Sequence, residues 1–259
     1  MDTPQRKYWK VLLIGDHCDD IYHYGTCSRL SPEAPVPVLK ELRVIKKKGM
    51  SSNVKMNLRS FGINVTHHHN TEKIEKHRII DERFNHQLVR YDVGEQGYCK
   101  EFNPEILEQT GTFDAVVISD YNKGFLGNRA VGMLCDMYSH LPIFVDSKNP
   151  VLSAYSGCIM KVNEKEFKNI NKMPKDSTFV VTLGERGALY EDEIYSTEKT
   201  EVFDVCGAGD VFLSALVYGW LKTEDMKKAI SIANRCASYS VSKAGTYVLS
   251  PGDINDLCV

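Results

Sequence analysis

Short apolar runs, each ended by polar residues or glycine, recur along the chain. The first, Val-Leu-Leu-Ile at residues 11–14, ends at Gly15-Asp16. Runs of the same form lie at residues 115–118, 143–145, 159–162 and 179–182. Runs this short with polar ends predict buried parallel strands, and helical patterns such as residues 131–139 separate several of them. The chain therefore predicts an α/β fold, in which a doubly wound, mostly parallel sheet is flanked by helices.

Two segments, residues 21–48 and 77–93, have the alternating pattern of extended strands. The first contains three prolines and pairs such as Val36-x-Val38, which do not fit a helix. The second has apolar stretches on either side of Asn85-His86, which predicts a hairpin turn. We expect both segments to form a small β flap, or lid, on a single domain that covers residues 1–259.

Composition and charge argue against several classes of function. Lys and Arg total 32 against 34 Asp and Glu, so a net charge of -2 offers no broad attraction to nucleic acid or to an anionic membrane. No apolar run approaches the roughly 20 residues that span a bilayer, and the first residues lack the apolar core of a signal peptide. The eight cysteines include no C-x-x-C pair, which favours reduced thiols. We expect a cytoplasmic protein whose partners are small molecules.

Three consecutive histidines at residues 67–69 offer imidazole groups to a metal. Consecutive side chains point in different directions, however, and no Cys, Asp or Glu stands at ligand spacing. We expect a solvated loop here and no structural zinc site.

The turn Gly207-Ala208-Gly209-Asp210 precedes a strongly apolar helical stretch at residues 211–220. Small residues let backbone amides approach an anion, and a helix N-terminus favours negative charge. Asp210 stands where a carboxylate could accept the proton of an attacking hydroxyl. A tight turn followed by Asp210 as an ordinary helix N-cap explains the same residues.

Two further segments could meet a nucleotide. Asn163 and Glu166 follow a predicted strand and stand on one side of a first helical turn, where they could orient hydrated magnesium and phosphate. A plain helix start fits them equally well. The segment from Thr182 to Gly187 is a strand end with two glycines, which fits either an approach to nucleotide phosphate or a hairpin turn.

Another pair of segments could grip a polyhydroxylated ligand. Asp16 and Asp20 follow the first strand, whereas Gly49 and Asn53 stand at the start of a helix that the spacing of apolar residues predicts from residue 51. Sugars need convergent carboxylate and amide groups for their hydroxyls. Surface turns rich in Asp and Ser are the ordinary alternative.

Taken together, these segments resemble the PfkB or ribokinase-like carbohydrate kinases. The hallmark of that family near the C-terminus, D-T-x-G-A-G-D, is similar to residues 204–210. The flap sequence Ser-Pro-Glu-Ala-Pro-Val-Pro, at residues 31–37, looks like that of the kinase domain of the bifunctional heptose synthases. The likeness spans about residues 9–252 and includes residues 53–58, 87–90, 119–124 and 243–246 and the motif Asp146-x-Lys148.

The resemblance implies a magnesium- and ATP-dependent enzyme that phosphorylates the anomeric C1 hydroxyl of D-glycero-D-manno-heptose 7-phosphate. It implies that Asp210 is the general base, that the amides of Gly207, Ala208 and Gly209 form an anion hole, and that Asn163 and Glu166 organise magnesium and phosphate, Glu166 through water. The implied sugar contacts are Asp16, Asp20, Gly49 and Asn53, with Asp120 and Lys123 near the phosphate-bearing end. The implied ATP contacts are Thr182, Gly184, Gly187 and Asn234. A homodimer through the β flap is also implied.

The sequence departs from the family pattern at several points. Met50 replaces the second of two glycines beside the sugar, and Cys206 replaces a threonine near the family's monovalent-cation site, which leaves potassium dependence open. Residues 62–77 look shorter than the family pattern, and the nucleotidyltransferase half of the heptose synthases has no counterpart in this sequence. A kinase of another sugar and a catalytically idle sugar- or nucleotide-binding protein therefore remain alternatives. A dinucleotide-dependent oxidoreductase is a third and much weaker alternative, because only Gly15 follows the first strand where G-x-G-x-x-G is required.

Overall fold

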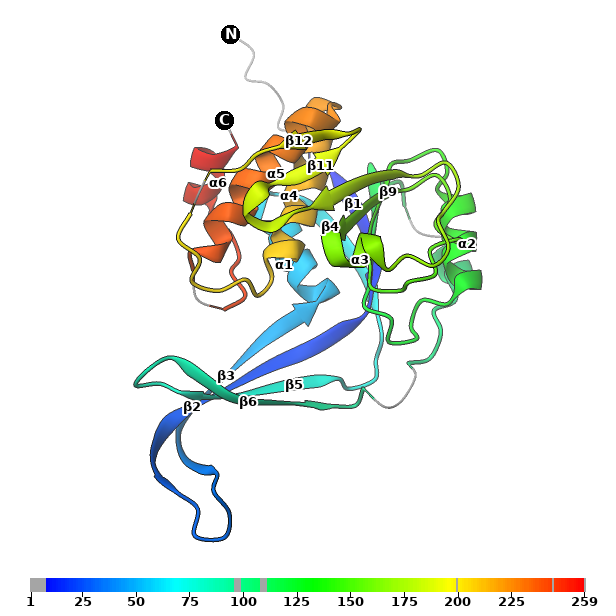
Figure 1. Cartoon of the computed structure of the whole chain (residues 1–259). Coiled ribbons are helices and arrows are strands. Elements are labelled where there is room, and N and C mark those ends of the chain that lie inside the picture. The colour runs from blue at the N-terminus through cyan, green and yellow to red at the C-terminus, as the bar shows by residue number, and fades with distance from the viewer. Residues whose placement is uncertain (1–7, 96–98, 108–110, 199, 244, 259) are drawn as a thin grey trace.

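Each apolar run predicted from the sequence forms a strand of one eight-stranded sheet (Figure 1). The computed structural model describes all residues except 1–7, 96–98, 108–110, 199, 244 and 259, so the opening segment and Ala244 lie outside the described residues. The strands that correspond to the runs are β1 (Lys10–Gly15), β7 (Ala115–Asp120), β8 (Ile143–Ser147), β9 (Ile159–Asn163) and β10 (Thr178–Thr182). All five predicted strands are thus confirmed.

The sheet is parallel except at one edge. Its strand order is β12-β11-β10-β9-β8-β7-β1-β4. The strands from β10 to β4 (Asn64–His69) are parallel to their neighbours. β11 (Ala188–Tyr190) and β12 (Glu193–Tyr195) complete the other edge as an antiparallel pair. The carboxyl ends of the parallel strands therefore lie along one side of the sheet, where open α/β sheets bind ligands.

Helices cover both faces of this sheet. Side chains of β1 point alternately to the two faces and enter a different apolar cluster on each. Val11 and Leu13 belong to the cluster that includes residues of α1 (Ser51–Ser60), α4 (Ala208–Thr223) and α5 (Met226–Val241). Leu12 and Ile14 belong to the cluster that includes residues of α2 (Asn128–Met137). The remaining short elements are η1 (Pro104–Leu107), α3 (Glu164–Lys168), η2 (Gly184–Arg186) and α6 (Pro251–Leu257). The α/β fold with helices on both faces is confirmed.

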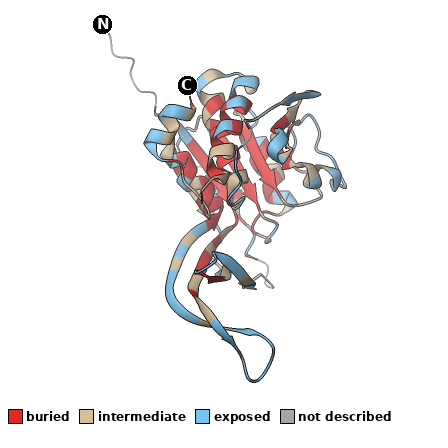
Figure 2. Cartoon of the chain, turned by 60° about the vertical axis from the view of Figure 1, so that its left-hand side comes forward, coloured by how far each residue is buried: buried red, intermediate tan, exposed pale blue. Residues whose placement is uncertain are grey.

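A second sheet of four strands projects from the body and forms the lid (Figure 1). Its order is β3-β2-β5-β6, built from β2 (His17–Leu30), β3 (Pro37–Met50), β5 (Glu75–Asp81) and β6 (His86–Val93). β2 is antiparallel to β3 and parallel to β5. Much of the lid is exposed, whereas the strands of the body are buried (Figure 2). The extended strands predicted for residues 21–48 and 77–93 are present.

The lid leaves and rejoins the body at glycine-bearing junctions. β2 begins two residues after Gly15 ends β1, and β3 ends at Met50, directly before α1. A Cβ atom at Gly49 would lie only 2.3 Å from Oδ2 of Asp20, so the junction has no room for a side chain there. Met50 has a φ of 55°, a left-handed backbone that glycine adopts more readily, and its side chain is buried in the cluster of Leu12.

The solvated loop expected for residues 67–69 was wrong. These histidines end β4, in which Leu13 of β1 aligns with His67 in the parallel register. The Nε2 atom of His67 also lies 2.9 Å from the hydroxyl of Ser51 at the start of α1. The backbone groups of these histidines therefore pair with β1 in the sheet, although their polar composition had suggested a loop in water.

The cysteines and the acidic and histidine side chains form no disulfide or metal cluster within the described residues. All eight cysteines are free thiols. No cluster of three or more His, Cys, Asp or Glu residues suited to a metal occurs within the described part of the chain. In the same residues, no helix has both the length and the apolar character to cross a bilayer.

Candidate active site

Asp210 lies in the first turn of α4, and its side chain does not cap the helix. The N-cap is Gly207, whose φ of 81° is left-handed. One carboxylate oxygen of Asp210 accepts a hydrogen bond of 2.7 Å from the side-chain amide of Asn53, and the other accepts one of 3.0 Å from the hydroxyl of Tyr121. The ordinary-cap interpretation is therefore wrong, and the carboxylate is held by groups from two other elements.

The surroundings of Asp210 suit a general base. Its side chain is buried, and this burial, together with the charge of Asp146, raises its pKa to about 6, although Asn53 and Lys161 act in the opposite direction. Burial and the neighbouring Asp210 also raise the pKa of Tyr121, so the phenol stays protonated and donates. A carboxyl group with a pKa near 6 is ionised at neutral pH and is more basic than an ordinary aspartate.

The glycine-rich turn has two backbone amides that donate to no acceptor among the described residues. Within the described residues, the amides of Gly207 and Gly209 have no acceptor, whereas that of Ala208 donates to the carbonyl of Val205 at 3.3 Å. A Cβ atom at Gly209 would lie 2.9 Å from Nζ of Lys161, so the turn packs closely on a cation. Gly207 and Gly209 thus fit the predicted anion hole, whereas the amide of Ala208 is already used.

Four charged side chains form a continuous chain beneath this turn. Nζ of Lys161 lies 2.6 Å from Asp146, and Nζ of Lys148 lies 2.7 Å both from Asp146 and from Glu166. Burial alone would raise the pKa of Asp146, but the two ammonium groups hold it at about 2. Sequence reasoning gave Lys161 no role. The signal was present, because Lys161 is the one charged residue in the run Ile-Met-Lys-Val at residues 159–162.

Asn163 and Glu166 form a capping box at the start of α3. Each side chain accepts a hydrogen bond of 2.8 Å from the backbone amide of the other residue. Since Lys148 contacts the second oxygen of Glu166, both oxygens are occupied by protein groups. The helix-start interpretation thus holds, and a hydrated magnesium ion, which keeps several waters, fits Glu166 through water better than directly.

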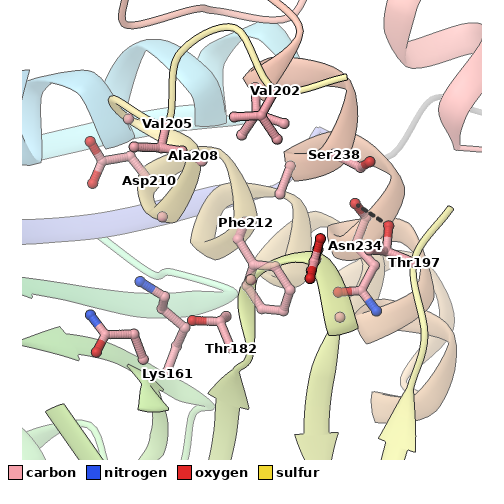
Figure 3. Close-up of a pocket in the computed structure, with 18 of the residues that line it drawn as sticks. Lys161, Thr182, Thr197, Val202, Val205, Ala208, Asp210, Phe212, Asn234 and Ser238 are labelled. Carbon is pink, nitrogen blue, oxygen red and sulfur yellow. Dashed lines mark hydrogen bonds between the residues drawn. The ribbon is translucent and has the colours of Figure 1, made fainter. Parts of the chain in front are cut away.

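A cavity of about 480 Å³ lies between the carboxyl ends of β9 and β10 and the helices α4 and α5 (Figure 3). Its lining includes the charged side chains of Asp210, Lys161 and Lys148 and the apolar side chains of Val202, Val205, Phe212, Ala237 and Val241. A volume of this size is typical of sites for small molecules.

All four residues predicted on the ATP side, Thr182, Gly184, Gly187 and Asn234, line this cavity. The two glycines also belong to a hairpin, since β10 and β11 pair antiparallel across them. A Cβ atom at Gly187 would lie 2.0 Å from the carbonyl oxygen of Tyr195, so this turn requires glycine. The hairpin and the cavity wall are therefore the same structure.

The predicted sugar residues gather where the lid meets the body. Asp16 is fully buried, and one of its oxygens accepts a 2.7 Å hydrogen bond from the amide of Tyr121. Its other oxygen has no partner within the described residues, and burial raises its pKa to about 6. Asp20 contacts Arg78 of the lid at 2.5 Å, and Asn53 contacts Asp210. Of these side chains, Asn53 contacts Asp210 directly, and Asp16 is linked to it through Tyr121, whose amide donates to Asp16 and whose hydroxyl donates to Asp210.

Asp120 and Lys123 lie in different surroundings. Both oxygens of the buried Asp120 are used inside the protein, by the hydroxyls of Ser147 and Tyr155 and by the amide of Asn122. Nζ of Lys123 lies 2.9 Å from Glu95 and is partly exposed. Asp120 is therefore placed to hold the loop after β7, whereas the role predicted for Lys123 near the sugar stays a prediction.

Comparison with known proteins supports the family resemblance. A family model described as pfkB family carbohydrate kinase matches residues 142–252. Two similar curated proteins are both called Bifunctional protein HldE. The protein from Campylobacter jejuni subsp. jejuni (strain NCTC 11168) is 30% identical over 293 residues, which cover 95% of this chain and 64% of that protein. The one from Nitratiruptor sp. is 31% identical over 304 residues, with the same shares. The chain thus spans slightly less than two thirds of the length of these relatives.

Solved structures share the fold at low sequence identity. Phosphofructokinase-2 from Escherichia coli, solved in complex with potassium, has a TM-score of 0.77 and 15% identity, with 97% of this chain and 98% of that chain covered. Ribokinase from Thermotoga maritima has a TM-score of 0.69 and 13% identity, with 96% and 99% covered. The chain therefore has the ribokinase-like fold, and its residues 142–252 match the model of the pfkB family of carbohydrate kinases.

Proposed function

We propose that this domain transfers the γ-phosphoryl group of ATP to the anomeric C1 hydroxyl of D-glycero-D-manno-heptose 7-phosphate. The observation that carries the proposal is the position of Asp210. Its carboxylate lines the cavity that suits ATP and at the same time contacts Asn53, which belongs to the predicted sugar site. The kinship with the HldE proteins and the flap sequence at residues 31–37 support a heptose phosphate as the acceptor.

In the proposed reaction, the carboxylate of Asp210 accepts the proton of the C1 hydroxyl while that oxygen attacks the γ-phosphorus in line. The amides of Gly207 and Gly209 and the ammonium of Lys161 stabilise the charge that develops on the transferred group. Asp16, through its unpaired oxygen, and Asn53 orient the sugar. Asn163 and Glu166 would hold a magnesium ion through water. That ion would offset the negative charge of the phosphates.

The proposal includes no potassium ion. Burial raises the pKa of the Cys206 thiol, so this group stays protonated. A neutral thiol is a soft and weak ligand for a hard cation such as potassium, unlike the threonine hydroxyl of the family pattern.

A substrate screen tests the function directly. Purified protein with magnesium and ATP should release ADP with D-glycero-D-manno-heptose 7-phosphate, and phosphorus NMR should show a new phosphate on C1. Release with a different sugar phosphate would revise the acceptor and keep the kinase. No sugar-dependent ADP release from any heptose, hexose or pentose phosphate would overturn the proposal and favour an idle binding protein.

We also propose that the outer face of the lid forms a homodimer contact. Val44, Val89 and Tyr91 on this sheet are 46%, 51% and 46% exposed, although apolar side chains of this size usually find cover. In the strand register, Val44 and Val89 share a face through His23 and Ile79. We expect the wild type to sediment as a dimer, and Val89→Glu to shift it to monomer. A wild type that sediments as a monomer at high concentration would contradict this.

A further inference from the structure

We infer that Lys76 and Lys123 form a subsite for the phosphate already carried by the sugar, and that Glu95 occupies this subsite before the sugar arrives. The inference rests on the proposed function, since it names residues that recognise the second phosphate of that substrate. It adds Lys76 and Glu95, to which the sequence analysis assigned no role.

The subsite joins one lysine of the lid with one of the body. Nζ of Lys123, which follows β7, lies 2.9 Å from one oxygen of Glu95, and Nζ of Lys76, on lid strand β5, lies 3.9 Å from the other. The side chains of Lys76 and Lys123 are only 14% and 21% exposed. Two partly buried ammonium groups thus share a single carboxylate. A phosphate monoester, whose charge near neutral pH is about -1.5 to -2, matches this pair better than a carboxylate does.

The neighbouring charges on this face of the lid have other partners, because Asp92, which aligns with Lys76, contacts Arg90 at 2.5 Å, and Lys47, which aligns with Asp20, donates to the carbonyl of Thr246 at 3.1 Å. Lys76 aligns with Asp20 of β2, so both side chains point to the same side of the sheet. Arg78, two residues further along β5, also points this way and contacts Asp20 at 2.5 Å. Arg78 therefore takes up the charge of Asp20, and Lys76, on the same side of the sheet, faces the predicted sugar contacts.

The subsite lies beside the sugar contacts and outside the nucleotide cavity. Nζ of Lys76 lies 5.7 Å from the centre of the Tyr121 ring, and the hydroxyl of that ring contacts Asp210. The backbone amide of Lys123 approaches Asp16 at 3.4 Å. Lys148 contacts the same ring at 5.7 Å and lines the cavity, whereas Lys76 is not among the lining residues. A sugar bound between Asp16 and Asp210 can therefore direct its distal phosphate to Lys76 and Lys123 without competing with ATP.

Binding then exchanges one anion for another. The phosphate of the sugar replaces the carboxylate of Glu95 between the two ammonium groups, and no covalent bond changes. Because one lysine belongs to the lid and the other to the body, the phosphate that binds both also holds the two parts together.

Calorimetry with a matched pair of ligands tests the subsite. The probes are D-glycero-D-manno-heptose 7-phosphate and the same heptose without phosphate, titrated into the full chain in the presence of a non-hydrolysable ATP analogue. Lys76→Met should weaken binding of the phosphorylated heptose roughly ten- to hundredfold, as expected for loss of a charged partner, and leave the other unchanged. Glu95→Gln should tighten binding of the phosphorylated heptose. Lys76→Arg should recover much of the loss.

Lys73→Met is the matched control. Lys73 precedes the same strand, is 72% exposed and contacts Glu75, so its replacement removes one positive charge without touching the subsite. It should leave both affinities unchanged, and melting temperatures check that each variant is folded.

The outcomes separate the subsite from the kinase. Equal weakening of both ligands in Lys76→Met, or a wild type that does not prefer the phosphorylated heptose, would overturn the subsite. Weaker or unchanged binding in Glu95→Gln would overturn the role of Glu95. A wild type that binds with the expected preference but releases no ADP would overturn the proposed kinase reaction and leave the subsite standing.

Discussion

Replacing Asp210 by Asn should lower kcat by about 10²- to 10⁴-fold, because the variant loses the group that accepts the proton. The same change should make the protein more stable at neutral pH. The pKa of Asp210 is raised from 3.8 to about 6, so its ionised form is costly in the folded state. A shift of this size corresponds to about 3 kcal/mol, the upper limit of the expected gain. Thermal unfolding followed by circular dichroism measures the stability, and steady-state ADP release measures kcat.

The sign of the pH dependence checks the same assignment. Since the folded pKa lies above the unfolded value, Asp210 favours folding at low pH, and this contribution is lost as the pH rises through about 6. The stability gain of Asp210→Asn should therefore shrink at acid pH. Wild-type kcat/KM should fall as the pH drops below about 6, with a steeper slope if Asp16, whose pKa is raised to the same value, must also be ionised.

Asp256→Asn, on the exposed side of α6, is the matched control and should change neither kcat nor stability. Retention of kcat within tenfold in Asp210→Asn would remove Asp210 as the base. A clear loss of stability at neutral pH would contradict the cost that we assign to its burial.

Replacing Lys161 by Met should destabilise the fold by about 3–5 kcal/mol, the usual cost of removing one partner from a buried ion pair. Asp146 and Lys161 are 2% and 3% exposed, so the carboxylate left behind keeps one charged partner among the described residues, Lys148. The size of methionine limits the loss of packing. Chemical denaturation at neutral pH gives the free energy of unfolding.

A double variant separates the charge from the packing. Asp146→Asn combined with Lys161→Met removes both charges, and it should be more stable than Lys161→Met alone. Lys165→Met, on the exposed side of α3, should change the free energy by less than about 0.5 kcal/mol. The effect on the free energy of unfolding in the double variant could equal the sum of the effects of Asp146→Asn and Lys161→Met measured separately. That result, or a cost of less than about 1 kcal/mol for Lys161→Met, would show that the ion pair does not stabilise the fold as we describe.

The strands of the body were predictable because their signal is local. In residues 11–14, four apolar side chains in a row must all be buried, and only a strand covered on both faces does this in so short a length. The lid was predictable for a similar reason, since its prolines and alternation exclude a helix. The histidines at residues 67–69 misled the prediction because pairing along β1, which lies far from them in sequence, decides their structure.

The site was predictable as a set of motifs but not as a network. Asp210 stands in a recognisable turn, so its position was foreseen from residues 204–210. Tyr121 and Lys161 were not assigned, because their value depends on contacts with Asp210 and Asp146 that join distant parts of the chain. Asp120 shows the opposite case, since its motif resembles a binding sequence whereas its oxygens accept internal hydrogen bonds, and its role near the sugar stays a prediction.

The junctions between lid and body restrict how the sugar specificity of this protein can be changed by substitution. Asp16 precedes the first residue of β2, and Gly49 lies just before the start of α1. The proposed sugar contacts therefore lie in the segments that connect the lid to the body. We therefore expect a substitution that reshapes the pocket there to change the orientation of the lid as well. Selectivity and lid orientation are thus not independent variables, and successful redesign should require paired changes in which a new contact near Asp16 is matched by an adjustment around Gly49.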